Sequence, residues 1–240
     1  MKIFESDDKD VFIKKLRKNR YLIQIPYNKN TSIGQKRKIF WDNFPWSNLK
    51  IVEKGSSKEE LRDIIIQTEA VQTLPEFFAR KNYNIGYQMA LRLFTDIGNQ
   101  LKTLEQFNIY LAPLDLKDIV VIGEHFFIME DAKNVVFYSN VIELKTNMLK
   151  IIHKWQKNKF IGPEISQIKS LPETISIRSS YYNIGALVVY VLFKKYVDPT
   201  SSNLQENIET IIENIKETKL YWALKRSMEP EAKDRYILII

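Results

Sequence analysis

Apolar and polar residues alternate through much of the first seventy residues, which is typical of strands. The pattern predicts five strands, at Ile3–Glu5, Val11–Lys15, Tyr21–Ile25, Leu49–Val52 and Ile64–Gln67. Between the third and the fourth, a helix is predicted to begin at a Ser32 cap, run through Trp41 and end before Pro45. Five strands and one helix would form a small α+β lobe.

From Leu74 onward the apolar residues recur every three or four positions, which indicates helices. One long amphipathic helix is predicted from the stripe Leu91, Phe94, Ile97, Leu101 and Leu104. A strand pair is expected around the turn Gly123-Glu124, and the run Ile184–Phe193, apolar on every side, predicts a fully buried helix. The change of period predicts two domains, residues 1–73 and residues 74–240.

The segment 108–131, NIYLAPLDLKDIVVIGEHFFIMED, resembles the catalytic loop of protein kinases, H-R-D-L-K-P-E-N, followed by a buried strand, a turn and D-F-G. Overlaid without a gap, Pro113 stands at the catalytic Asp and Asp115 at the Lys two positions later. Asp118 stands at the metal-binding Asn, and Asp131 opens D-A-K where D-F-G is expected. The resemblance therefore covers the order of the segments rather than any intact motif.

Three later segments extend the resemblance. Gly162-Pro163-Glu164 is similar to the A-P-E motif, and 180–185 to the start of the buried central helix, with Ser180 where kinases have Asp. Arg235 resembles the Arg that pairs with the A-P-E glutamate, which implies a buried Glu164–Arg235 ion pair. The resemblance implies a bilobal protein-kinase-like α+β fold, with a small β-rich N-lobe and a larger, mainly helical C-lobe. The spacing of these motifs is also similar to that of small kinases from large DNA viruses.

The departures from the kinase pattern remove the residues that carry the chemistry. A proline at position 113 cannot accept a proton from a substrate hydroxyl. The turn 6–10 has three carboxylates and no glycine where kinases use a Gly-rich loop, and Gln24 replaces the phosphate-binding Lys. The resemblance thus implies a pseudokinase, which is not an enzyme, needs no cofactor and acts as a protein-binding or structural scaffold.

One alternative keeps an enzyme. Asp118 and Asp131 could face one cleft and hold Mg²⁺ or Mn²⁺ through oxygen, with Asp115 as a substitute base. That arrangement would make the protein an atypical metal- and ATP-dependent phosphotransferase. The competing interpretation is that the three carboxylates are ordinary turn and strand-end residues.

The net charge of +7 suggests a second alternative, a basic module that binds nucleic acid or an acidic surface. Lys14, Lys15, Arg17 and Lys18 form the proposed basic patch, which continues to Arg20. Two further clusters are Lys36-Arg37-Lys38 and the looser set Lys150, Lys154, Lys157 and Lys159. The competing interpretation is a solvated face of a lysine-rich protein.

The chain contains no cysteine, which excludes disulfides, thiolate nucleophiles and cysteine zinc sites. Its start lacks the pattern of a signal peptide, and its longest apolar run is too short to span a bilayer. We therefore expect an intracellular protein of the cytoplasm, or of the host cytoplasm or virion if the viral resemblance holds.

Overall fold

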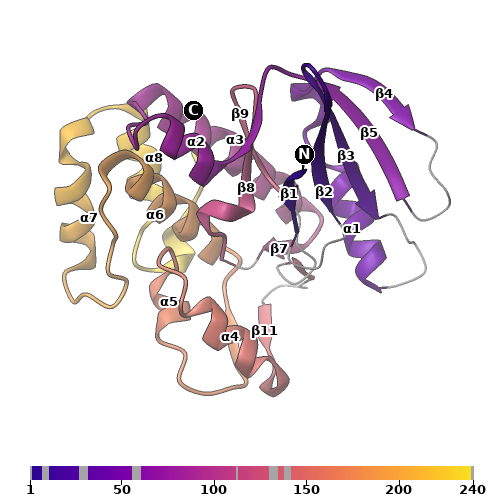
Figure 1. Ribbon diagram of the computed structural model, residues 1–240. Helices are drawn as coiled ribbons and strands as arrows, with labels where there is room; N and C mark the ends of the chain where they lie inside the picture. Colours follow the sequence, from indigo (N-terminus) through magenta and orange to yellow (C-terminus); the bar gives the residue numbers. More distant parts are fainter. Residues whose placement is uncertain are drawn as a thin grey trace. The chain divides into compact units, whose positions relative to one another are not determined.

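The computed structural model describes residues 2–6, 11–26, 32–55, 61–111, 113–129, 135–137 and 142–238. The chain forms two compact units, residues 1–83 with 116–135 and residues 84–115 with 136–240 (Figure 1). The segment 116–135 therefore packs with the first unit although it follows the first part of the second. The division into domains 1–73 and 74–240 stays a prediction, because compactness alone does not show which parts fold independently.

The first unit contains a five-stranded antiparallel sheet in the order β1-β2-β3-β5-β4. Its strands are β1 (Lys2–Glu5), β2 (Phe12–Arg17), β3 (Arg20–Pro26), β4 (Ile51–Gly55) and β5 (Leu61–Gln67). β2 and β3 are joined by the two-residue turn Lys18-Asn19, where Asn19 takes a left-handed conformation with φ 61°. Asn tolerates this conformation well, which explains why so short a hairpin turn forms here.

Helix α1 (Ser32–Asp42) and the 3-10 turn η1 (Trp46–Asn48) connect β3 to β4. Trp41 is fully buried, and its ring lies 5.0 Å from that of Phe44. Phe44 in turn stacks on Phe127 at 5.2 Å. These aromatic contacts connect the α1 segment to strand β9 (His125–Ile128) of the same unit.

A second, three-stranded sheet in the order β6-β8-β9 completes the first unit, with helix α2 (Leu74–Arg80) and the 3-10 turn η2 (Leu116–Asp118) beside it. Its strands are β6 (Val71–Thr73), β8 (Ile119–Ile122) and β9 (His125–Ile128). The predicted Gly123-Glu124 turn joins β8 to β9, and Gly123 has φ 64°. All four residues of β8 are buried, so this short hairpin is part of the core.

The second unit is mainly helical. It contains α3 (Tyr87–Gln106), α4 (Leu149–Trp155), α5 (Pro163–Ser166), α6 (Ser179–Phe193), α7 (Leu204–Ile212) and α8 (Lys219–Ser227). Short 3-10 turns lie at η3 (Thr146–Met148), η4 (Glu213–Ile215) and η5 (Ala232–Asp234). There are also two small two-stranded sheets. One pairs β7 (Ile109–Leu111) with β10 (Val135–Phe137), and the other pairs β11 (Ile142–Leu144) with β12 (Glu173–Ile175). The small antiparallel-sheet region and the helical region together give the predicted α+β class.

Helix α6 is the centre of the second unit and contacts α3, α7 and α8. Its residues from Ile184 to Val189 are buried, as the unbroken apolar run predicts, but Tyr190, Leu192 and Phe193 near its C-terminal end are only half-buried, so the predicted burial of the whole run is correct only in part. The helix begins five residues before that run, at Ser179, and of these five residues all except the half-buried Ser180 are buried. On α3 the predicted stripe is buried except for Leu91, which is half-buried, while Leu93 takes a core position.

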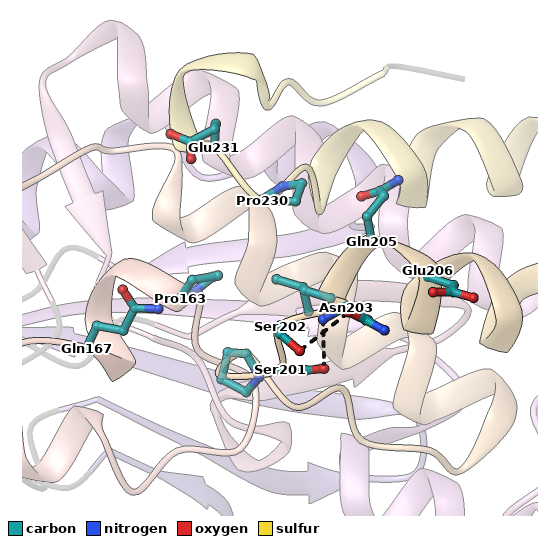
Figure 2. Close-up of a pocket in the computed structure, with 11 residues that line it drawn as sticks. Pro163, Gln167, Ser201, Ser202, Asn203, Gln205, Glu206, Pro230 and Glu231 are labelled. Atoms are coloured by element: carbon teal, nitrogen blue, oxygen red, sulfur yellow. Dashed lines mark hydrogen bonds between the residues drawn. The ribbon is translucent and has the colours of Figure 1, made fainter.

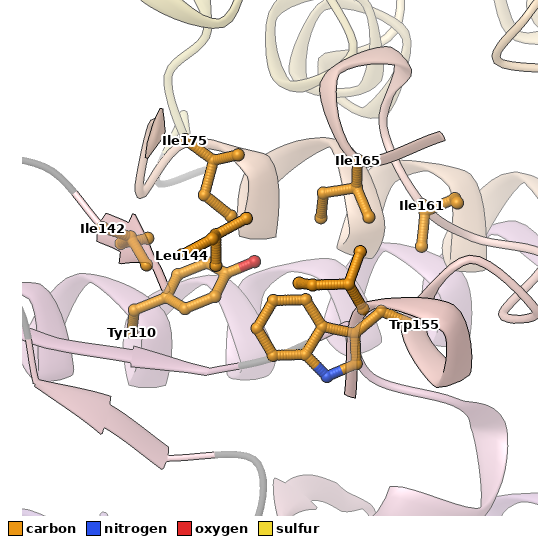
Figure 3. Close-up of a cluster of buried hydrophobic side chains, with 8 residues drawn as sticks. Tyr110, Ile142, Leu144, Trp155, Ile161, Ile165 and Ile175 are labelled. Carbon is orange, nitrogen blue, oxygen red and sulfur yellow. The ribbon is translucent and has the colours of Figure 1, made fainter. Parts of the chain in front are cut away.

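A separate apolar cluster orders the segment between β11 and α5 (Figure 3). The rings of Tyr110 and Trp155 form a T-shaped pair with centroids 6.3 Å apart, and aliphatic side chains surround them. The other members are Ile142, Leu144, Ile152, Ile161, Ile165 and Ile175. The segment from residue 142 onward is therefore packed around an apolar core of its own.

The pair Glu164 and Arg235 joins α5 to the C-terminal segment of the second unit. Arg235 is fully buried, and its guanidinium donates to both carboxylate oxygens of Glu164, at 2.6 and 3.0 Å. It also donates to the carbonyl oxygens of Glu229 (2.5 Å) and Pro230 (2.7 Å). The ion pair that the motif spacing implies is therefore present, and it is bidentate.

Because α6 packs tightly on α8, we expect Gly185→Val to destabilise the protein by about 1–3 kcal/mol. A Cβ at Gly185 would lie only 2.4 Å from Cγ of the buried Met228 and 2.6 Å from Oγ of Ser227. The matched control is Gly86→Ser at the N-cap of α3, where a Cβ meets nothing within 4 Å and Ser is a favourable cap. Urea unfolding should separate the two variants, and equal midpoints would contradict the close packing.

Removing one partner of the ion pair should cost more, about 3–5 kcal/mol for Arg235→Ala, because the half-buried carboxylate of Glu164 is left without its cation and the side chain of a buried residue is lost. Burial alone would raise the pKa of Glu164, but the hydrogen bonds and charge of Arg235 outweigh it and hold that pKa below its usual value. A carboxylate with a lowered native pKa contributes stability at neutral pH that is lost as the pH falls through the acidic range. The wild type should therefore lose stability in acid, whereas Glu164→Gln should show a weaker acid dependence in unfolding experiments.

Candidate functional site

The segment that resembles the catalytic loop, Leu111 to Asp115, has buried aliphatic side chains in the second unit. Leu111 and Leu114 are each 2% exposed, and Pro113 is also buried. Ala112 lies outside the described residues. None of the side chains described between Leu111 and Leu114 can exchange a proton or act as a nucleophile. At position 113, where the sequence predicts that the catalytic base is missing, the chain forms a short segment that packs as part of the core.

Two asparagine side chains hold this segment. Asn183, on α6, accepts from the Leu114 N–H at 2.9 Å and donates to the carbonyl oxygens of Leu114 and Phe160, both at 3.1 Å. Asn158 donates to the carbonyl oxygens of Pro113 (3.2 Å) and Leu114 (3.0 Å), and it accepts from the Phe160 N–H at 2.8 Å. We call Asn158 and Asn183 the amide clamp, because together they satisfy the backbone of this segment with neutral groups.

Sequence reasoning missed the amide clamp. Ser180 stands at the position of the kinase Asp, but its hydroxyl donates to the Ile177 carbonyl oxygen of its own turn at 2.8 Å. Asn183, nearly one turn further along α6, makes the contact with the loop instead. The available signal was a polar residue directly before an apolar run, because a buried amide in such a place needs partners.

Gln24, at the position of the phosphate-binding Lys, lies on β3 in the first unit. Its side-chain amide donates to the carboxylate of Asp63 at 2.7 Å, and the two residues are directly opposite in the β3–β5 ladder. This hydrogen bond engages the side chain of Gln24 within the sheet. A neutral amide here also lacks the positive charge that a nucleotide phosphate requires.

Helix α1 carries no glutamate, as the sequence shows, and its buried charged residue is the cation Arg37. Arg37 is 7% exposed, so this member of the cluster Lys36-Arg37-Lys38 is not part of a basic surface. Lys38 pairs with Asp42 at 2.5 Å, and nothing is described of the Lys36 side chain. An active kinase site is ordered by a Lys–Glu pair. Here Gln24 stands at the lysine position and α1 contains no glutamate, so neither member of the pair is present at these positions.

The proposed metal ligands are only partly described. Asp118 ends η2, is half-buried, and its backbone carbonyl accepts from the Met129 N–H at 3.1 Å. Asp131 and the acidic residues of the turn 7–10 lie outside the described residues. Asp115 is half-buried in the second unit. Within the described part of the chain no group of three His, Asp or Glu side chains could hold a metal, and the Asp118–Asp131 site stays a prediction.

A pocket of about 460 Å³ opens in the second unit between α5, the loop before α7 and the segment after α8 (Figure 2). Its walls include three prolines, Pro163, Pro199 and Pro230. The remaining lining residues are Gln167, Ser201, Ser202, Asn203, Leu204, Gln205, Glu206 and Glu231. Among these lining residues two are acidic and none is basic, in a protein whose net charge is +7.

Contacts within the second unit fix the pocket walls. Pro163 precedes Glu164, and the Pro230 carbonyl oxygen accepts from Arg235, so the ion pair connects two of the walls. On the third wall, Ser201 Oγ accepts from the Asn203 N–H (3.3 Å) and the Asn207 side chain (2.8 Å). The Oε1 atom of Gln205 is buried and has no hydrogen-bond partner within the described residues. Because this oxygen is buried, it is not part of the surface that a ligand in the pocket would contact.

No helix in the described ranges is both long and apolar enough to cross a membrane.

Comparison with known proteins supports the fold. No family model and no curated protein matches the chain. Among solved structures 1973 chains match, including the autoinhibited serine kinase domain of the giant muscle protein titin. That match covers 99% of this chain and 75% of the titin chain, with a TM-score of 0.60 and 14% identity. The fold is therefore protein-kinase-like; the resemblance to viral kinases stays a prediction.

Proposed function

We propose that this protein is a catalytically inactive, kinase-like module that binds another protein. The observation that carries the proposal is the structural use of two positions that resemble catalytic ones. Pro113 and Leu114 are buried and held by the amide clamp, while Gln24 is bonded to Asp63. Phosphoryl transfer requires a charged lysine, a base and metal ligands placed around the nucleotide, and the first two are replaced here.

The pocket of the second unit supports the binding part of the proposal. Its size lies within the range of small ligand sites, and its two carboxylates favour hydrogen-bond donors. The prolines and the open first turn of α7 suit an extended backbone, whose carbonyl groups can accept from free helix N–H groups. We infer that the occupant is an extended segment of a partner protein that carries lysine or arginine.

For an inactive module, ATP, ADP and GTP should leave the melting temperature unchanged, with or without Mg²⁺ or Mn²⁺. A nucleotide bound at a hundred times its Kd would stabilise a native protein by about 2.7 kcal/mol. For a chain of this length that corresponds to a rise of about 5–10 °C, which a thermal-shift assay detects easily. Phosphorylation assays with generic protein substrates should likewise give no signal above the background.

The phosphotransferase alternative predicts a different thermal-shift result. A metal-dependent shift that disappears in Asp118→Asn or Asp131→Ala would favour the phosphotransferase alternative and contradict the inactive module. Asp234→Asn is the matched control, because Asp234 is exposed on η5 in the second unit. A shift lost in all three variants would indicate general loss of stability rather than loss of a metal ligand.

Charge complementarity at the pocket predicts selective binding of basic peptides. In fluorescence anisotropy, proline-containing peptides rich in lysine and arginine should bind, whereas glutamate-rich peptides of the same length should not. The double substitution Glu206→Lys and Glu231→Lys should abolish this binding, because it reverses both pocket charges.

The matched control for the pocket is Glu143→Lys with Glu217→Lys. These two glutamates are exposed on the second unit and do not line the pocket, so the change of net charge is the same. Equal loss of binding in both double variants would mean that net charge, not the pocket, selects the peptide.

A further inference from the structure

Six cations lie on β2, in the turn that follows it and at the adjacent ends of β3 and β4 in the five-stranded sheet. Lys14, Lys15 and Arg17 are on β2, Lys18 is in the following turn, Arg20 begins β3, and Lys50 directly precedes β4. All six are exposed. We call this set the cationic rim; it extends the basic patch of the sequence to two further residues, Arg20 and Lys50.

Strand register arranges part of the rim in a row. Arg17 is opposite Arg20 in the β2–β3 pair, and Arg20 is opposite Gln67 in the β3–β5 pair. Gln67 donates its backbone N–H to the Lys50 carbonyl oxygen at 2.9 Å, which brings Lys50 to the same end. Since neighbouring strands are about 4.8 Å apart, the row spans about 14 Å across four chain segments.

The rim brings like charges together without compensation. Like charges directly opposite each other destabilise a strand pair, and this occurs at Arg17–Arg20. Lys14 is also opposite a cation, Lys2, but Lys2 is paired with Glu5 at 2.6 Å. Within the described part of the chain, none of the six rim cations has a carboxylate partner. Other described cations do, including Lys38 with Asp42 at 2.5 Å and Lys225 with Glu209 at 2.6 Å. An external polyanion would relieve the repulsion.

The form of the rim favours a phosphate backbone over a lipid surface. A row of separate cations can contact successive phosphates, whereas stable attachment to a bilayer also requires an apolar face. The exposed large aliphatic residues of this sheet are Leu16 and Val52, on different strands. Phe12 and Tyr21 are covered by Lys14 and Lys15, at 5.8 Å in each case, and offer no open ring on which a base could stack.

We propose that the cationic rim binds the phosphate backbone of nucleic acid without sequence preference. The rim lies in the first unit, and the inference does not depend on the pocket or on the loss of catalysis. Contacts of this kind position a nucleic acid but read no sequence, because the phosphates are the same at every base.

The test is anisotropy with short labelled DNA and RNA of mixed sequence at several salt concentrations. With about six phosphate contacts, binding to duplex DNA should weaken about a thousandfold between roughly 50 and 200 mM salt. The variant Lys15→Gln, Arg17→Gln, Arg20→Gln should bind more weakly, with a slope of log K against log salt smaller by about 2.7 in magnitude. Its melting temperature should equal or exceed that of the wild type, since opposed charges are removed.

The matched control, Lys169→Gln with Lys195→Gln and Lys219→Gln, removes the same charge from exposed positions of the second unit. It should retain nearly all the binding and the slope. Equal loss in both variants, a wild-type affinity independent of salt, or binding to phosphatidylserine vesicles but not to nucleic acid would each overturn the proposal. If the triple variant melts earlier than the wild type, the smaller change Lys14→Gln with Lys18→Gln provides the same comparison.

Discussion

The buried guanidinium of Arg235 is the constraint on which the second unit depends. A cation in the interior is tolerated only when its charge and its donors are satisfied, and Glu164 with the carbonyl groups of Glu229 and Pro230 provides this. Because Glu164 lies on α5 and Arg235 lies 71 positions later, one interaction determines where the C-terminal segment closes. It thereby positions Pro163 and Pro230, two walls of the pocket.

The amide clamp shows how a kinase-like scaffold can be kept without ionised groups at the loop. A buried charge requires a matched partner, so losing one member of a charged network strongly destabilises a protein. Asn158 and Asn183 avoid that difficulty, because an amide both donates and accepts and can satisfy backbone groups in either direction. The same principle applies at Gln24, where a neutral amide bonds to Asp63 across the sheet. Neutral amides at these positions satisfy their partners without placing a further charge in the interior.

The sequence predicted those features that depend on local pattern. Alternation identified the strands, though β4 runs from Ile51 to Gly55 rather than from Leu49 to Val52, since propensity alone places strand ends poorly. The unbroken apolar run identified α6, and the Glu164–Arg235 pair followed from motif order. The clamp, the pocket and the Gln24–Asp63 bond depend on contacts between segments distant in sequence, and local patterns contain no information on them. The burial of Arg37 was missed for the same reason, because a run of three basic residues usually indicates a solvated face.

Charge is distributed unequally between the two proposed binding surfaces. The cationic rim of the first unit has six cations that pair with no carboxylate of the described residues, whereas the pocket of the second unit is lined by two carboxylates and no cation. A polyanion at the rim and a basic segment at the pocket would each meet the opposite charge. Neither ligand would compete for the other surface, because like charges repel it there. A kinase-like protein with two such surfaces could in this way bind two partners of different kinds, using local charge to keep them separate.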